Sequence, residues 1–278
     1  YSWGNNTYGQ LGLGYTGGIE TAPQKVMTNV VKIAAGPYFA VALDKDGKVY
    51  AWGDNYSGQL GTGESAVTVN IPHEVTSFSD NEIKITDISA GGYDRYGFAL
   101  ALTEEMMVYA WGANNLHQVS ALNAQSYNVP TLTSLTRITE VSAGDYATGY
   151  ALTETGTVKA WGNNTHREHG TATPAAVSNV TLGSGNRAVA IDSGYAAAYA
   201  ITANKRVYGW GANNGVGTLG STASVTYPVQ LTALDGTVAV AGGLTTLALG
   251  GTDNNGRILA AGLNTSGQAG RGDYANVA

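Results

Sequence analysis

The chain lacks cysteine and carries little charge of either sign. Its 278 residues include no Cys, 14 Lys and Arg, and 20 Asp and Glu, so the formal net charge is −6. Without thiols the chain forms no disulfides and no thiolate-ligated metal site, although it is compatible with any redox compartment. Phosphate backbones are bound by clustered cations, and the sequence contains no basic run. We therefore expect no nucleic-acid partner.

Long apolar runs and long helix-forming runs are missing as well. No stretch approaches the roughly 20 apolar residues of a membrane-spanning helix, so we expect no membrane insertion. The chain begins at Tyr1 without an initiator Met or a signal peptide, which we interpret as a processed product or an excised segment. Gly and Tyr are abundant instead, at 39 and 17 residues, and they favour short strands and tight turns over helices.

A repeated Trp-Gly-x-Asn sequence is the dominant pattern of the chain. The Trp residues of the five copies are Trp3, Trp52, Trp111, Trp161 and Trp210, and a sixth, altered copy begins at Ala261-Gly262. The spacings are 49, 59, 50, 49 and 51 residues, and Asn stands two residues after the Gly in all six copies. A period of about this length indicates a solenoid or a propeller.

Each unit divides into short strands. Alternating apolar residues predict three strands, at Val31–Ala35, Phe39–Leu43 and Val49–Gly53. A turn at Gly36–Tyr38 and an Asp-Gly hairpin at Asp44–Gly47 separate them, and a weaker fourth strand is expected near Pro72–Val75. The sequence therefore predicts an all-β protein, a β-propeller of four-stranded antiparallel blades.

The repeats predict the domain organisation. We expect residues 1–278 to form a single β-propeller domain or a fragment of one, with about five full repeats and a partial terminal repeat. The predicted repeats are residues 1–50, 51–109, 110–159, 160–208 and 209–260, with the partial repeat at 261–278. We predict that the five Trp side chains pack between blades, and that the Gly after each Trp allows close approach of the backbone.

Two stretches carry a resemblance to a known family. "WGNNTYGQLGLG" at Trp3–Gly14 and "VYAWGDNYSGQLGTG" at Val49–Gly63 resemble repeats of the regulator of chromosome condensation family. The resemblance implies a seven-bladed propeller. The chain departs from the family pattern because no His follows its Ala-Gly turns. The Gly-Gln-Leu-Gly element is also lost at His117–Ser120 and unrecognisable at His166–Gly170. We interpret the chain as a divergent bacterial- or viral-type copy.

Tyr residues gather on the loops that share one face of the predicted blades. Strand alternation places the Ala-Gly turns on the same side as the Trp-Gly-x-Asn loops. The candidate partner-binding residues on this side are Tyr8, Tyr38, Tyr56, Tyr93, Asp94, Arg95, Tyr96, Tyr146 and Tyr195. Tyr offers a large contact area at low rotamer entropy, which favours recognition, although any single ring could pack over a strand end instead. The longest repeat has an extended turn, and we expect Asp94, Arg95 and Tyr96 to project from it.

The sequence offers no catalytic or metal-binding constellation. The two His of "HREH" at His166–His169 are too few for a zinc site, and "DKDG" at Asp44–Gly47 lacks the remaining ligands of a calcium loop. Without Cys, and with four scattered His, no nucleophile-base pair is evident. We therefore expect no enzyme activity, no metal and no cofactor. Five sequons occur, at Asn5, Asn55, Asn163, Asn179 and Asn264, and four of them come from the Asn-rich turn of the repeat.

These observations favour a non-catalytic interaction module. We expect it to belong to a larger extracellular, cell-surface or virion-associated protein and to bind a protein or glycan through its Tyr-rich face. The resemblance keeps two alternatives open. One is a regulator of a small GTPase that acts by guanine-nucleotide exchange in the cytoplasm, as the founding member of the family does. The other is a protein inhibitor of an enzyme.

Overall fold

The structure is a computed structural model of the chain, and it forms two compact units, Tyr1–Ala143 and Gly144–Ala278. It describes residues 1–64, 66–121, 124–172, 176–212, 225–243, 245–250, 256–262, 264, 265, 269, 270, 272 and 275. Apart from one short α-helix and one 3-10 turn, the regular elements of the described residues are all β-strands. The predicted all-β class is therefore confirmed.

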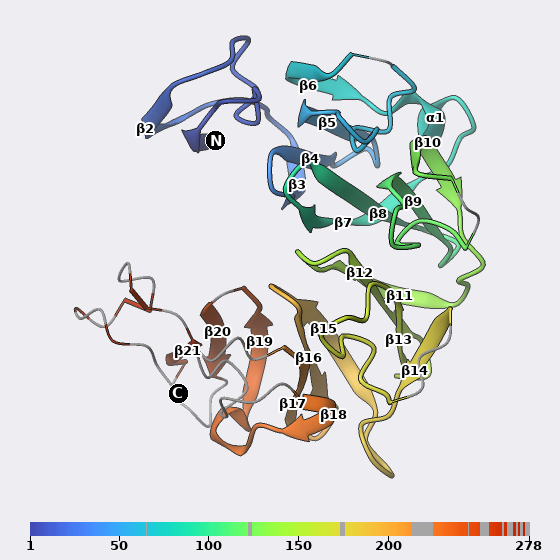
Figure 1. Cartoon of the computed structure of the whole chain (residues 1–278), viewed down its shortest axis with the longest axis vertical. Coiled ribbons are helices and arrows are strands. Elements are labelled where there is room, and N and C mark those ends of the chain that lie inside the picture. The colour runs from blue at the N-terminus through green and yellow to red at the C-terminus, as the bar shows by residue number, and fades with distance from the viewer. Residues whose placement is uncertain are drawn as a thin grey trace. The chain divides into compact units, whose positions relative to one another are not determined.

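Unit 1 consists of antiparallel sheets that follow one another along the chain (Figure 1). The first sheet pairs β1 (Ser2–Asn5) with β2 (Ile19–Gln24). The second joins β3 (Val30–Ala35), β4 (Phe39–Asp44), β5 (Val49–Asp54) and β6 (Thr68–Glu74) in sequence order. The third joins β7 (Ile85–Tyr93), β8 (Tyr96–Thr103), β9 (Val108–Ala113) and β10 (Ser126–Leu132). Helix α1 (Thr76–Ser79) precedes β7, and β11 (Ile138–Ala143) ends the unit.

Unit 2 continues the same order of antiparallel strands. Strands β12 (Thr148–Thr153), β13 (Val158–Gly162) and β14 (Val177–Val180) pair in sequence. A four-stranded sheet joins β15 (Ala188–Ser193), β16 (Ala197–Thr202), β17 (Val207–Gly211) and β18 (Val225–Gln230). Strands β19 (Thr237–Ala241), β20 (Thr245–Gly250) and β21 (Ile258–Gly262) follow the 3-10 turn η1 (Thr232–Leu234).

The strands of the second sheet agree closely with the sequence pattern. In the β4–β5 pair, Phe39 lies opposite Gly53 and Leu43 lies opposite Val49, and the backbone N–H of Gly47 donates to the Asp44 carbonyl in the hairpin between them. The predicted fourth strand is also present, but β6 begins at Thr68, earlier than expected. The register between β5 and β6 shifts between Ala51 and Gly53, and the two strands pair on both sides of this irregularity.

Proline marks the fourth strand of several repeats. Pro23, Pro72, Pro130 and Pro228 lie in β2, β6, β10 and β18, each of which ends the order of its sheet. Proline has no N–H to donate to a neighbouring strand, so it is tolerated at a sheet edge and discourages further pairing there. The outer position of these strands explains why their sequence signal is weaker.

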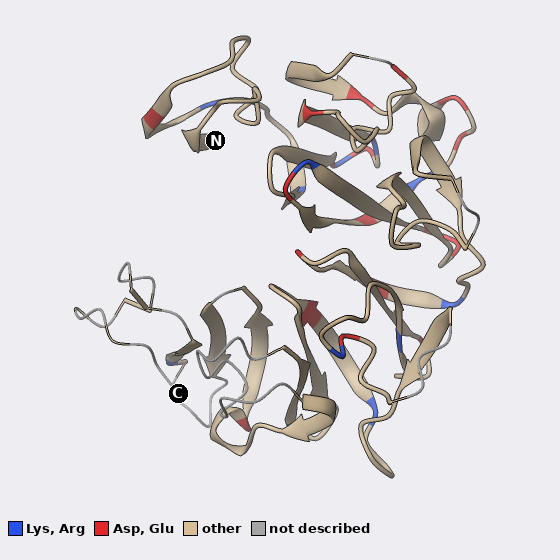
Figure 2. Ribbon diagram, viewed as in Figure 1, with Lys and Arg blue, Asp and Glu red and all other residues tan. Residues whose placement is uncertain are grey.

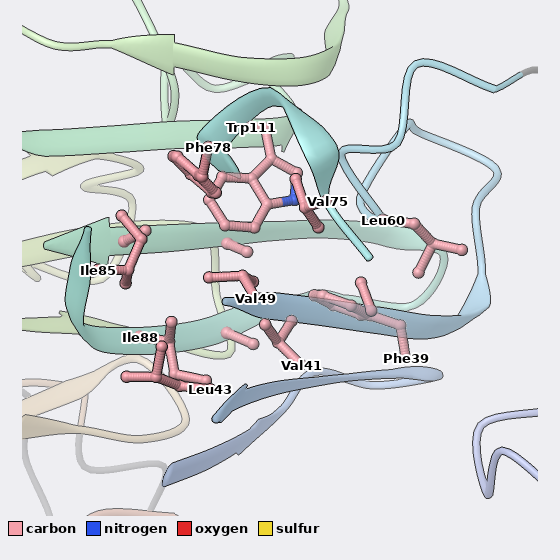
Figure 3. Packing of buried hydrophobic residues seen from close by; sticks show 14 residues of the cluster. Phe39, Val41, Leu43, Val49, Leu60, Val75, Phe78, Ile85, Ile88 and Trp111 are labelled. Carbon is pink, nitrogen blue, oxygen red and sulfur yellow. The ribbon is translucent and has the colours of Figure 1, made fainter. Parts of the chain in front are cut away.

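The core of unit 1 lies between the second and third sheets (Figure 3). Val41 and Val49 face Ile88 and Trp111 across the interface, and each large apolar side chain buried there contributes about 1.5–3 kcal/mol. The insertion of the second repeat adds to this core. It carries α1, whose Phe78 ring lies 5.9 Å from the Trp111 ring between centroids. The long insertion therefore supports packing as well as forming surface.

Four of the five indoles are buried. Those of Trp52, Trp111 and Trp210 donate a hydrogen bond to the loop of the preceding repeat. The Nε1 atom of Trp52 donates to the Gln10 carbonyl at 2.9 Å, and that of Trp111 donates to the Gln59 carbonyl at 2.9 Å. Trp210 repeats the contact with the Glu168 carbonyl at 2.8 Å. The indoles of the second, third and fifth repeats thus join consecutive repeats through a hydrogen bond as well as through apolar contact.

Trp3 differs from the prediction that all five indoles pack between blades. Its side chain is 61% exposed, whereas the other four indoles are buried. Trp52, Trp111 and Trp210 each use a carbonyl supplied by the loop of the repeat before them. Trp3 belongs to the first repeat of the printed sequence, and within that sequence no earlier repeat supplies such a carbonyl.

The repeat loops keep one hydrogen-bond pattern even where the sequence motif has changed. In five copies the Asn side-chain oxygen accepts the backbone N–H of the residue five positions later. These pairs are Asn6–Leu11, Asn55–Leu60, Asn114–Val119, Asn164–His169 and Asn264–Ala269, at 2.8–3.1 Å. The third and fourth loops, interpreted as lost and unrecognisable, therefore persist. His117 and Arg167 adopt φ of 60° and 72°, where Gly9 and Gly58 have 74°.

The glycine that ends the Gly-Gln-Leu-Gly element makes room for the next indole. A Cβ on Gly61 would lie 2.6 Å from Nε1 of Trp111, and φ at Gly61 is +69°. We predict that Gly61→Ala lowers the free energy of unfolding by several kcal/mol, from about 1–2 kcal/mol of left-handed strain and about 1–3 kcal/mol of overpacking. Urea denaturation measures this change.

Gly17→Ala is the matched control for Gly61→Ala. Gly17 also has a positive φ, +87°, but its Cβ would meet nothing within 4 Å. This variant should show the backbone strain alone. Equal losses of stability in the two variants would refute a steric role for Gly61.

Candidate recognition surface

The third sheet carries a hairpin that extends beyond the corresponding turn of the second. The β7–β8 pairing continues through Gly92 opposite Gly97 to Tyr93 opposite Tyr96, whereas β3 and β4 stop at Ala35 opposite Ala40. Asp94 sits at the turn with φ of 49°, a left-handed conformation that Asp tolerates in tight turns. The extension places Arg95 against the loop that follows β5 of the second sheet.

Arg95 forms an ion pair with a buried carboxylate instead of projecting as expected. Its Nη2 atom lies 2.5 Å from Oδ1 of Asp54, and Nε lies 3.3 Å from both carboxylate oxygens. The Asp54 side chain is fully buried and also accepts from Nε2 of Gln59 at 3.0 Å. The hydrogen bond to this carboxylate raises the pKa of the Arg95 guanidinium. The extended turn therefore lies over the second-repeat loop.

Tyr rings surround the Arg95 guanidinium. Its central carbon lies 4.9 Å from the Tyr8 ring centroid and 4.6 Å from that of Tyr56, both within cation–π range. The contacts continue from Tyr8 to Tyr38 at 4.8 Å and from Tyr56 to Tyr96 at 6.0 Å between centroids.

The structure brings seven of the nine predicted residues together in unit 1. Tyr93 completes the set, because its ring lies 5.3 Å from that of Tyr96 and its hydroxyl accepts from Nδ2 of Asn115 at 2.7 Å. We call the set the Arg95 surface, and it comprises Tyr8, Tyr38, Tyr56, Tyr93, Asp94, Arg95 and Tyr96. Tyr56 is 55% exposed and Asp94 is exposed, while the other members are half-buried.

The remaining two predicted residues form a cluster in unit 2. The rings of Tyr146 and Tyr195 lie 5.2 Å apart in an edge-to-face arrangement, and His166 lies 4.8 Å from Tyr146 on another side. Burial raises the pKa of the Tyr195 hydroxyl. Each unit therefore has its own group of contacting Tyr rings.

Sequence reasoning missed a buried carboxylate beneath the unit 2 cluster. Glu168 occupies the position of Gln10, Gln59 and Gln118 in the other loops. Its Oε2 atom accepts the backbone N–H of His166 at 2.7 Å, as the Gln side chains do in their own loops, and its Oε1 atom lies 3.3 Å from Nδ1 of His166. Burial raises the pKa of Glu168. Alignment of the six loops on their Asn residues would have identified this substitution.

The second His of the His166–His169 stretch is structural. His169 is buried, and its Nε2 and Nδ1 atoms lie 3.2 Å from the Gly162 carbonyl and the Ser178 hydroxyl. Burial lowers the pKa of His169, which favours the neutral ring. Among the residues that the structure describes, no three His, Cys, Asp or Glu side chains are placed to hold a metal ion.

Charge is sparse on both units. Lys and Arg occupy scattered positions and form no continuous stripe in the described residues (Figure 2). No helix in the described part of the chain is long and apolar enough to cross a membrane.

Comparison with known families identifies the fold. A family model described as the RCC1-like domain matches residues 1–278. The chain belongs to the RCC1-like domain family. The resemblance read from the Trp-Gly repeats is thereby confirmed, and so is the β-propeller fold class.

Curated relatives of this RCC1-like domain include much longer proteins. The E3 ubiquitin-protein ligase HERC2 of Homo sapiens is 30% identical over 223 residues, which cover 76% of this chain and 4% of HERC2. Protein RCC1 of Candida albicans is 34% identical over 130 residues, which cover 40% of this chain and 27% of that protein. The chain thus spans only a small part of these relatives.

Solved structures share the fold at lower identity. Human WBSCR16 has a TM-score of 0.72 at 21% identity, covering 86% of this chain and 64% of that chain. Prp20p from Saccharomyces cerevisiae has a TM-score of 0.62 at 17% identity, covering 99% of this chain and 83% of that chain. At these identities the likeness concerns the fold alone.

We predict that Arg95→Met destabilises the domain by about 3 kcal/mol, because it leaves the buried Asp54 carboxylate without its cation. The double variant Asp54→Asn/Arg95→Met removes both charges and should recover most of the loss. Urea denaturation of both variants measures the difference. Equal stability of the single and double variants would show that the ion pair does not hold the extended hairpin.

We predict that Glu168→Gln stabilises the domain at neutral pH by about 1 kcal/mol, because Gln keeps the acceptor for the His166 N–H but removes a buried charge. Because burial raises the pKa of Glu168 in the folded state, the wild type loses stability as the pH rises through that pKa. Gln does not titrate, so the advantage should shrink as the pH falls through the same range. Thermal unfolding at several pH values tests this, and a pH-independent difference would contradict it.

Proposed function

We propose that this RCC1-like domain is a non-catalytic module that binds a protein partner through the Arg95 surface. The observation that carries the proposal is the gathering of five Tyr and one Arg side chains into one chain of ring contacts around Arg95. The residues come from the turns and loops of three successive sheets. Such a concentration exceeds what is needed to cover the end of a single strand.

The physical character of this surface suits protein recognition. Tyr and Arg are enriched among the residues that dominate binding energy at interfaces. Here Asp54 and the neighbouring rings hold Arg95 in place, so less side-chain entropy is lost on binding. Beneath the surface, the buried Asp54 carboxylate already bonds to Gln59 and Arg95, which supports a binding role over acid–base chemistry.

The relatives favour a protein ligand over a glycan. One structural report on Prp20p concerns its binding properties to Gsp1p and histones, and another shows Kap60 bound to the same yeast protein. A place within a larger extracellular, cell-surface or virion protein is also part of our proposal, with the cytoplasm as the alternative. A glycan remains the second class of ligand to test.

A second candidate function is guanine-nucleotide exchange on a small GTPase. The 34% identity to Protein RCC1 of Candida albicans over 130 residues favours it. Release of a fluorescent guanine nucleotide from a panel of small GTPases, with and without the chain, tests this function directly. Acceleration by the wild type that is lost in Arg95-surface variants would support exchange over simple binding.

We predict that the double variant Tyr56→Ala/Tyr96→Ala weakens partner binding at least about tenfold, or roughly 1.4 kcal/mol, because it removes exposed ring area from the surface. Photo-cross-linking from position 56 would first capture the partner, and titration with the purified partner would then give the Kd of each variant.

Tyr227→Ala provides the control for this binding experiment. Tyr227 is 60% exposed on β18 and lies outside the Arg95 surface. Its removal should leave binding unchanged. If the Tyr56/Tyr96 variant folds normally and binds as tightly as the Tyr227 variant, the Arg95 surface is not the binding site.

A further inference from the structure

The structure separates the five sequons into two classes. Asn5 and Asn179 are exposed. In contrast, Asn55, Asn163 and Asn264 are 7%, 5% and 0% exposed. An Asn-x-Ser/Thr sequence becomes an N-glycan site only if the fold can accommodate a large hydrophilic group on the amide nitrogen. The two classes therefore differ in whether a glycan is compatible with the native state.

Asn55 uses its whole side-chain amide inside the repeat loop. Its Oδ1 atom accepts the N–H of Leu60 at 3.1 Å, and its Nδ2 atom donates to the carbonyls of Ala66 at 2.8 Å and Glu64 at 3.3 Å. A sugar on Nδ2 would replace one of these hydrogens and would have to occupy the space beside buried carbonyls. The loop would have to open to admit it.

The same arrangement in other loops shows that burial of this Asn belongs to the repeat. Asn6 and Asn114 are not sequons, yet they are also buried, and Nδ2 of each donates to a carbonyl nine or ten residues later at 2.9 Å. Asn264 is the equivalent residue of the sixth copy and is fully buried. The sequons at Asn55 and Asn264 thus coincide with the residue that closes the loop.

Asn163 is buried for a different reason. It stands one position earlier in its repeat, and its Nδ2 atom donates to the Tyr146 carbonyl at 3.0 Å and to Oε1 of Glu168 at 3.4 Å. Its Oδ1 atom accepts the N–H of Thr165 at 3.1 Å. A glycan here would separate the loop from the Tyr146 turn.

Asn179 lies in an open position. It is exposed on β14, an outer strand, and its Oδ1 atom accepts from the exposed Lys159 Nζ at 3.1 Å. Asn5 is likewise exposed, and only its Oδ1 atom accepts hydrogen bonds, from the Thr7 N–H and from Nε2 of Gln10. A sugar on Nδ2 of either residue can extend into solvent without breaking these contacts.

We propose that the native domain can carry an N-linked oligosaccharide only at Asn179 and Asn5, and that transfer to the other three sequons before folding prevents the native fold. In that transfer, the Asn Nδ2 atom bonds to C1 of the sugar and loses one proton. The bond between C1 and the diphosphate of the lipid-linked donor breaks, and the diphosphate leaves. Transfer to Asn55, Asn163 or Asn264 of the unfolded chain would block closure of the loops.

The first experiment compares transfer to the folded and unfolded chain. The unglycosylated chain is incubated with a single-subunit oligosaccharyltransferase that accepts Asn-x-Ser/Thr and with a lipid-linked oligosaccharide, and each site is quantified by peptide mass spectrometry. We expect occupancy at Asn179 and Asn5 alone in the folded chain, and at all five sites in tryptic peptides. Substantial occupancy at Asn55 or Asn163 of the folded chain would overturn the proposal.

The second experiment asks whether these sequons obstruct folding in a glycosylating compartment. The chain is directed into the secretory route of a eukaryotic cell, alongside the triple variant Ser57→Ala/Thr165→Ala/Ser266→Ala. This variant removes the three sequons but keeps every Asn. We expect it to be secreted severalfold better than the wild type. Equal secretion of the two proteins would overturn the proposal, provided that thermal unfolding shows equal stability after production without glycosylation.

Discussion

The fold depends on one recurring contact, the hydrogen bond from a Trp Nε1 atom to a carbonyl in the loop of the preceding repeat. Trp52, Trp111 and Trp210 each make it at 2.8–2.9 Å. A four-stranded sheet cannot bury its apolar face alone, so a repeat gains stability only from its neighbours. The indole joins neighbouring repeats in two ways. Its ring fills the space between them, and its Nε1 atom donates a hydrogen bond to a carbonyl of the preceding loop.

That contact constrains the loop that receives the indole. The loop must present its carbonyl at a fixed place, and the Asn of Trp-Gly-x-Asn achieves this by accepting an N–H five residues later. At the end of the first, second and fourth loops, Gly12, Gly61 and Gly170 leave room for the next indole, because an added Cβ would lie 2.6–3.0 Å from it; the third loop ends in Ser120 instead. Trp, Asn and Gly therefore depend on one another across repeats, and this dependence explains why these three residues recur with the period.

The same dependence determines what the sequence could predict. Strand positions followed from alternation, and the shared side of turns and loops followed from strand direction, because both rules act locally. The inward turn of Arg95 could not be predicted, since its partner Asp54 is 41 residues earlier and becomes a neighbour only when the sheets pack. The core role of Phe78 was hidden for the same reason, because an insertion without periodicity resembles a solvent-exposed loop. The third and fourth loops were interpreted as lost because the Gly-Gln-Leu-Gly element is absent there. Their hydrogen-bond pattern is nevertheless kept by the Asn side chain.

The residue between Gly and Asn in each motif gives the loops their individual chemistry. In the first repeat Asn5 accepts a hydrogen bond from the loop Gln and brings no charge. In the second repeat Asp54 accepts the same bond from the loop Gln but adds a buried negative charge. A buried charge requires a partner of opposite sign, and Arg95 provides it. Arg95 also brings its contacts with the Tyr rings. In the fourth repeat the polarity is reversed, because Asn163 donates to Glu168. Variation at one position that the scaffold does not fix therefore produces different surfaces on loops of the same shape.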